Sequence, residues 1–262
     1  MNIIDQPENK LERLLRQAAN EPAHRPEFYR VLLDSMVCVL GYEGEEDDDE
    51  NDGLLSIQNW EREDGFSVIP FFTSLHALEE VIEDEQSYLE MPVKALFEIT
   101  LGATLVLNPS SEYSKDFMPE EVNSLLESGA GQTTEQRVIE HDTDVMIGEV
   151  ENYPAELIAS LTTLFSKHDN LKAAYLAEIE DPETNGSNLI IGVQGEGDLE
   201  NVISEAGAVA WDTLVNNEVL DFIVIDDEPD GICEYMLNET KPFYERIWGA
   251  KMQTSPDSSG QA

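Results

Sequence analysis

Basic residues are scarce in this chain of 262 residues. Only 14 lysines and arginines accompany 56 aspartates and glutamates, so the formal charge is 14 − 56 = −42 at pH 7. A field of this sign repels phosphate, and no segment gathers Lys or Arg into the basic face that nucleic-acid binding requires. We therefore expect no direct contact with nucleic acid and none with an anionic membrane surface.

Two interpretations of the acidity stay open. The surface either attracts basic partner proteins, or imitates DNA for them, or it is a solvated face adapted to a salty cytoplasm.

Cysteine and histidine are too few and too scattered to indicate a disulfide framework or a metal site. Cys38 and Cys233 lie far apart without a metal-ligand spacing, so both are expected to be reduced packing residues. No histidine lies three or four residues from another. The four are His24, His76, His141 and His168.

Catalytic and cofactor motifs are also missing. The glycines after a predicted strand fail the dinucleotide pattern, because the third glycine position counted from Gly195 is Glu200. The acidic segment 43–52 fails the calcium-loop pattern, because position twelve counted from Asp48 is Asn59 instead of a bidentate Glu. The sequence indicates no catalytic residue, no cofactor and no metal.

No apolar run approaches the ~18 residues that would suggest a membrane span. Residues 1–6 lack a basic region followed by an apolar core, so no secretion signal is indicated. The cytoplasm is the expected location.

Hydrophobic residues, in contrast, make up 41% of the chain, which is enough for a real core, and the length suits two compact domains. The stretch 64–82 carries the clearest local signals. Gly65 suits a tight turn, the apolar run 66–72 suits a half-buried strand, and Ser74 is placed to cap a helix. We expect a hairpin between 54–60 and 66–72, followed by that helix.

The first domain is predicted over residues 9–127, after a flexible N-terminus at 1–8, with an exposed acidic loop at 43–52. Apolar spacing and proline positions predict a mixed α/β domain whose sheet order the sequence does not give. The predicted helices are 9–19 and those that begin at Pro26, Ser74, Pro92 and Pro119. The predicted strands are 36–40, 54–60, 66–72, 88–91 and 104–107.

The second domain is predicted over residues 143–250, after a linker at 128–142 and before a disordered tail at 251–262. Its order is strand, helix, strand, strand, helix, strand, which indicates the ferredoxin-like split unit. The predicted strands are 145–150, 171–179, 188–193 and 221–225, and the helices begin at Pro154 and Asp198, with a short helix over 231–238. The overall class is α+β or mixed α/β.

The few basic residues are candidates for function because they are rare. Arg25 follows His24 in a segment bounded by prolines, and Arg246 lies between Tyr244 and Trp248. A fixed Arg in an acidic protein is either an internal brace that ties a loop to a carboxylate or, beside Tyr and Trp, an anchor at a protein interface. The candidate interface residues are His24, Arg25, Phe72, Tyr244, Arg246 and Trp248.

At these residues the chain also resembles a known family. The segments that carry the resemblance are 21–30 (EPAHRPEFYR), 67–75 (SVIPFFTSL), 91–98 (MPVKALFE), 160–165 (SLTTLF), 242–246 (PFYER) and Trp248 with Gly249. They are similar to the SseB, or enhanced serine sensitivity, proteins of bacteria over about residues 9–250. The resemblance implies a cytoplasmic protein with SseB N-terminal and C-terminal domains, named for a phenotype in serine metabolism, and it supplies no catalytic residues.

Three hypotheses for function follow. The leading one is a non-enzymatic regulatory or adaptor protein that binds another protein through its aromatic and Arg-bearing segments. The second is a small-molecule sensor or minor enzyme of serine or sulfur amino-acid metabolism, with its ligand held between the domains. The third is an acidic binder that imitates DNA.

Overall fold

The computed structural model describes residues 8–44, 55–129, 146–148, 150, 152–181, 186–214, 220–226, 229 and 231–246. Most of the acidic segment 43–52, most of the linker 128–142, the segment 1–7 and the tail 251–262 lie outside these residues. The contacts divide the chain into two units. The first comprises Met1–Gln136, Pro154–Leu164 and Glu200–Val219, and the second comprises Arg137–Tyr153, Phe165–Leu199 and Leu220–Ala262.

The first unit is therefore discontinuous in sequence, because it takes two helices from the second half of the chain. Its helices are α1 (Lys10–Asn20), the short 3-10 helix η1 (Pro22–His24), α2 (Arg25–Leu33), α3 (Leu75–Glu79), α4 (Val93–Ile99), α5 (Pro119–Ser128), α6 (Ala155–Phe165, except for its last residue) and α7 (Glu200–Thr213). Its strands are β1 (Met36–Glu43), β2 (Leu55–Ile57), β3 (Trp60–Glu61), β4 (Ser67–Phe72), β5 (Tyr88–Pro92), β6 (Thr104–Leu107) and β7 (Lys115–Phe117).

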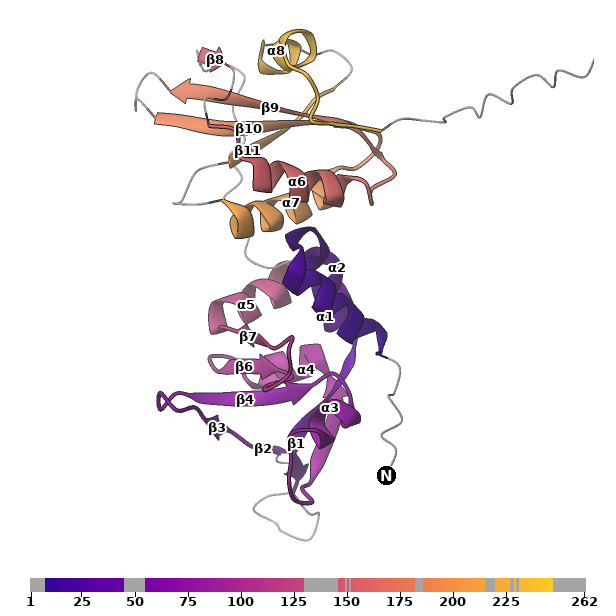
Figure 1. The fold of residues 1–262 in the computed structure, drawn as a ribbon, viewed down its shortest axis with the longest axis vertical. Helices are drawn as coiled ribbons and strands as arrows, with labels where there is room; N and C mark the ends of the chain where they lie inside the picture. The colour runs from indigo at the N-terminus through magenta and orange to yellow at the C-terminus, as the bar shows by residue number, and fades with distance from the viewer. Residues whose placement is uncertain are drawn as a thin grey trace, which may run out of the picture. The chain divides into compact units, whose positions relative to one another are not determined.

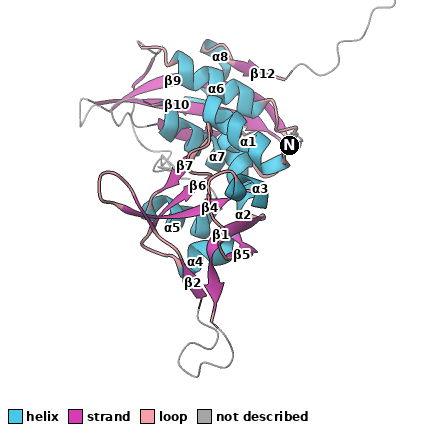
Figure 2. Ribbon diagram, turned by 60° about the horizontal axis from the view of Figure 1, so that its bottom comes forward, coloured by secondary structure: helices cyan, strands magenta, loops and turns pink. Residues whose placement is uncertain are grey.

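These strands form one mixed sheet in the order β2-β1-β4-β6-β7, with β5 paired to β1 and β3 paired to β4. Strands β4 and β6 run parallel, and the other pairs are antiparallel. Figure 1 shows α1, α2 and α5 on one side of β4, β6 and β7, and Figure 2 shows β5 beside β1. This sheet with its covering helices is the scaffold on which the candidate site is built.

Alternate residues of the strands enter two different cores, as the period of two along a strand requires. In the larger core, on one face of the sheet, Phe71, Phe97 and Phe117 pack ring against ring with centroids 5.6–6.1 Å apart. On the other face, Phe72 packs against Trp60 and α3. The larger core consists mainly of Leu11, Leu14, Leu15, Phe28, Leu32, Val37, Val39, Ile69, Phe71, Leu96, Phe97, Leu105, Leu107, Phe117, Val122 and Leu125.

The local signals read from 64–82 are confirmed. Trp60 pairs with Val68 across the turn, where Gly65 has φ +83°, a left-handed conformation that favours glycine. The Ser74 hydroxyl accepts a hydrogen bond from the Ala77 N–H and so caps α3.

Cys38 lies in the smaller core as a buried packing residue, and burial raises the pKa of its thiol to about 11. It is therefore protonated and unreactive at neutral pH.

In the second unit, strands β8 (Met146–Gly148), β9 (Leu171–Asp181), β10 (Gly186–Gly195), β11 (Leu220–Val224) and β12 (Tyr244–Glu245) form a sheet in the order β11-β10-β9-β12, with β8 paired to β9. Helix α8 (Gly231–Glu239) lies over this sheet (Figure 1). Its Cys233 and Met236 pack against Tyr175, Ile190 and Ile225. A Cβ at Gly192 would collide with the Met236 side chain of this helix and, at 2.8 Å, with Ile225 Cδ1, so the glycine allows both side chains to pack closely against β10.

The α+β class is confirmed, but the ferredoxin-like pairing is not. Strands β10 and β11 are direct parallel neighbours, and β8 pairs antiparallel with β9, whereas a split unit places another strand between its parallel pair. The order of elements was predicted correctly, but the antiparallel pairing expected of a ferredoxin-like unit is not confirmed, because partner choice depends on packing that local patterns do not encode.

The short strands β7 and β12 were not predicted, since two or three residues give no measurable alternation. The predicted strand 54–60 is two short strands, and the predicted hairpin is correct only at its end: β3 pairs with β4, whereas β2 pairs with β1. Among the described helices, none has the length and apolar composition needed to cross a bilayer.

We predict that Phe97→Ala destabilises the protein by about 3–5 kcal/mol, because it leaves a cavity between two other fully buried rings. The measurement is urea unfolding followed by circular dichroism. Ile99→Ala on the same helix is the control, because Ile99 is 52% exposed and its loss should change stability by about 0.5 kcal/mol at most. Equal effects of the two substitutions would contradict the assignment of this core.

Candidate ligand-binding site

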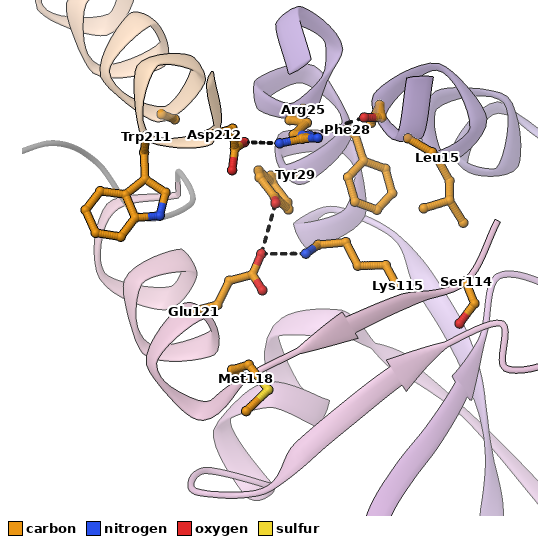
Figure 3. Close-up of a pocket in the computed structure, with 13 residues that line it drawn as sticks. Leu15, Arg25, Phe28, Tyr29, Ser114, Lys115, Met118, Glu121, Trp211 and Asp212 are labelled. Carbon is orange, nitrogen blue, oxygen red and sulfur yellow. Dashed lines mark hydrogen bonds and ion pairs between the residues drawn. The ribbon is translucent and has the colours of Figure 1, made fainter. Parts of the chain in front are cut away.

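A cavity of about 390 Å³ lies within the first unit, lined by residues of α1, α2, β7, α5 and α7 and by their flanking residues (Figure 3). Its walls are of two kinds. The apolar lining includes Leu15, Ala18, Phe28, Met118, Ala208 and Trp211, and the polar lining includes Arg25, Tyr29, Lys115, Glu121 and Asp212. The cavity thus places two of the chain's few basic side chains beside two carboxylates.

The first ion pair joins α2 to α7. Pro26, the second residue of α2, favours the start of this helix, which places Arg25 in its first turn. The Arg25 Nη1 lies 2.5 Å from Asp212 Oδ2, and its Nε donates to the Ala18 carbonyl at 3.2 Å. The guanidinium is therefore oriented from two sides.

The second ion pair joins β7 to α5. Lys115 Nζ lies 2.8 Å from Glu121 Oε1, and the Tyr29 hydroxyl donates to the same oxygen at 2.9 Å. The ammonium also lies 4.8 Å from the centroid of the Phe117 ring and 5.7 Å from that of Tyr29, which is the range of cation–π attraction.

Tyr29 lies between the two ion pairs, as Figure 3 shows. Burial raises the pKa of its phenol far above the usual value, and the negative charge of Glu121 adds to the effect. The hydroxyl therefore stays protonated at neutral pH and acts as a fixed donor to Glu121.

All four charged side chains are only partly exposed. Arg25 and Asp212 are 29% and 28% exposed, and Lys115 and Glu121 are 27% and 15% exposed. Charges withdrawn from water to this extent interact more strongly than surface charges, yet each can still be reached from the cavity. The described residues contain no group of three His, Cys, Asp or Glu side chains that could hold a metal ion.

Of the residues predicted from sequence, only Arg25 lines this cavity. His24 is the last residue of η1 and is half-buried. Phe72 is fully buried in the smaller core of the first unit, so it is no surface anchor. Trp248 lies outside the described residues.

Tyr244 and Arg246 lie in the second unit and brace the loop after α6. The Tyr244 hydroxyl donates to the Phe165 carbonyl at 3.1 Å, and the Arg246 guanidinium donates to the carbonyls of Ser166 and His168 at 3.2 and 3.0 Å. Its Nη1 lies 2.6 Å from Asp169, and this hydrogen bond raises the pKa of Arg246. Both side chains thus take the geometry of an internal brace.

Sequence reasoning missed Tyr29, Lys115, Glu121, Trp211 and Asp212. Lys115 could have been found by its scarcity, as Arg25 was. The two carboxylates could not, because nothing in the sequence distinguishes them among 56 acidic residues.

Two family models match the chain: the SseB protein N-terminal domain over residues 11–124 and the SseB protein C-terminal domain over residues 139–246. The chain belongs to the SseB family. It is 43% identical over 246 residues to Protein SseB of Escherichia coli (strain K12), a match that covers 94% of this chain and 95% of that protein. The Protein SseB of Shigella flexneri matches with the same identity and coverage.

No solved structure matches the chain. The resemblance noted in the sequence is thus confirmed as family membership. The pocket of this SseB-family chain is completed by α7, which belongs to the part matched by the C-terminal model.

We predict that Tyr29 makes the protein less stable as pH rises above about 10. The unfolded phenol ionises there while the folded one keeps its proton, so the unfolded state binds fewer protons and the free energy of unfolding falls, by up to about 1.4 kcal/mol per pH unit. Chemical unfolding of the wild type and Tyr29→Phe between about pH 9 and pH 11 measures the difference.

Tyr153→Phe is the control for this titration, because Tyr153 is 58% exposed and should leave the pH dependence unchanged. A wild type and a Tyr29→Phe variant with parallel pH profiles would contradict the buried, Glu121-facing position of the hydroxyl.

Proposed function

We propose that this SseB-family chain is a non-enzymatic regulatory protein that binds a small molecule in the pocket of its first unit. The observation that carries the proposal is the presence of two scarce cations, Arg25 and Lys115, in one cavity with apolar walls. Its volume of about 390 Å³ falls within the range of about 300–1,000 Å³ that is typical of ligand pockets. A few oriented polar groups among apolar walls is the usual composition of such pockets.

The polar groups of the pocket are suited to binding more than to catalysis. A general base needs a group that can accept a proton at working pH, and a nucleophile needs an activating base. Here Glu121 accepts from Lys115 and Tyr29, Asp212 pairs with Arg25, and the phenol holds its proton. Side chains that are already ion-paired or hydrogen-bonded in this way are suited to hold a ligand by charge and shape.

The geometry favours this ligand-binding hypothesis over the adaptor hypothesis. Three of the residues expected to anchor a protein partner are engaged inside the fold: Phe72 is buried, and Tyr244 and Arg246 brace a loop. The regulatory output, and its link to the serine phenotype for which the family is named, are part of the proposal.

The proposal predicts that at least one compound in a panel of amino acids, keto acids and nucleotides raises the melting temperature of the full chain. A ligand at about 100 times its Kd stabilises the folded state by about 2.7 kcal/mol, a shift of several degrees. Arg25→Gln should remove this shift, because it deletes a charge that lines the pocket.

Arg62→Gln is the matched control. Arg62 forms an Arg–Asp pair of similar length with Asp116, at 2.6 Å, but both side chains are more exposed and neither lines the cavity. The ligand-induced shift should survive in this variant. A shift that survives in Arg25→Gln as well would place the ligand elsewhere, and a panel without any shift would count against the proposal.

Protein binding is the second candidate, because large apolar side chains remain exposed at this cavity. Trp211 is 53% exposed and Met118 is 51% exposed, and both line the same cavity as Arg25. Trp and Arg are enriched among the residues that dominate the energy of protein interfaces.

This second candidate predicts that affinity capture from a bacterial lysate recovers a stoichiometric protein that resists a high-salt wash. Trp211→Ala should lose it, whereas Val224→Ala should retain it, because Val224 is similarly exposed at 47% but lies in the second unit. A partner that is released by the high-salt wash would indicate attraction to the protein's negative charge instead of an apolar contact.

A further inference from the structure

Building on the proposed function, we propose that the pocket of the first unit binds a zwitterion: a small molecule that carries a carboxylate and an ammonium group on an apolar body. The inference follows from the alternation of charge along the wall of the cavity. Arg25 pairs with Asp212 on one side of Tyr29, and Lys115 pairs with Glu121 on the other (Figure 3).

The four charges sum to zero, although the chain as a whole carries a formal charge of −42. A ligand of one sign meets an opposing charge wherever it binds, because each attractive side chain is paired with a repulsive one. An anion that reaches Arg25 also lies near Asp212 and enters against the field of the whole protein. A zwitterion satisfies both signs and has no net charge to be repelled.

The hydrogen bonds leave donors and acceptors for such a ligand in defined places. The described contacts of the Arg25 guanidinium use Nη1 and Nε, so Nη2 is positioned to donate to a ligand carboxylate. Both described contacts of Glu121 end on Oε1, so Oε2 is positioned to accept from a ligand ammonium. The ligand therefore binds without breaking either ion pair.

The apolar residues of the cavity wall determine which kind of side chain the ligand carries. Leu15, Phe28, Met118 and Trp211 are apolar, and Trp211 is half exposed. An apolar group that covers this surface removes it from water, which favours binding in proportion to the area buried. A zwitterion with a hydrocarbon or aromatic side chain meets this condition, and one with only a hydroxymethyl side chain does not.

The test is a set of calorimetric titrations on the full chain with charge-deleted probes. L-phenylalanine is compared with hydrocinnamate, which lacks the ammonium, and with phenethylamine, which lacks the carboxylate. L-leucine is compared in the same way with isocaproate and isoamylamine, and L-serine is the polar zwitterion. We expect at least one of the two apolar amino acids to bind at least about tenfold more tightly than both of its charge-deleted analogues and than serine.

Two variants separate a direct role from a structural one. Arg25→Gln should weaken the bound amino acid and not weaken its amine analogue, because Asp212 loses its positive partner, whereas Glu121→Gln should weaken the amino acid and not weaken its carboxylate analogue, because Lys115 loses its negative partner. A general loss of structure would weaken every probe alike, and thermal melting of each variant checks that it folds.

A carboxylate or amine analogue that binds as tightly as its amino acid, or variants whose effects do not follow the charge of the probe, would overturn the zwitterion inference. If neither apolar amino acid binds but another compound of the panel shows an Arg25-dependent shift, this inference falls while the proposed pocket function stands. If nothing binds in either experiment, both fall.

Discussion

The ion pair between Arg25 and Asp212 is the constraint on which the candidate site depends. It ties the first turn of α2 to the end of α7, two elements far apart in the sequence, and the carbonyl of Ala18 fixes the same guanidinium to α1. Where α1, α2 and α7 meet, their apolar side chains leave a cavity that β7 and α5 close from the other side. The pair is partly shielded from water, so solvent screens the attraction between its two charges less than it does in the exposed pairs elsewhere on the chain.

The two ion pairs at the cavity are notable because lysine and arginine are scarce in this chain. In a chain of formal charge −42, a Lys or Arg on the surface has many carboxylates with which it can pair. Arg16, Arg62 and Lys94 do so in exposed pairs, where solvent screens the interaction. Arg25 and Lys115 instead pair at the wall of one cavity, which therefore carries charges of both signs and no net charge within a protein that is strongly negative.

Sequence reasoning recovered the elements of the fold better than their pairing, for a physical reason. Caps and turns are local, so Ser74 and Gly65 could be assigned from their neighbours alone. Sheet order depends on contacts between distant segments, which is why the parallel pairing of β10 with β11 was not foreseen. The site shows the same limit: Arg25 was singled out because it is rare, whereas Asp212 became visible only when folding placed it opposite that residue.

The discontinuity of the first unit has a consequence for the order in which the protein is made. The helices and strands up to Ser128 leave the ribosome first and already contain the larger aromatic core, but α7 begins only at Glu200. A nascent chain can therefore build a sheet and its core long before it has a complete pocket. Cutting the gene at the boundary between the two family domains would yield an N-terminal half without Trp211 and Asp212, so any selection on the pocket acts on both halves together.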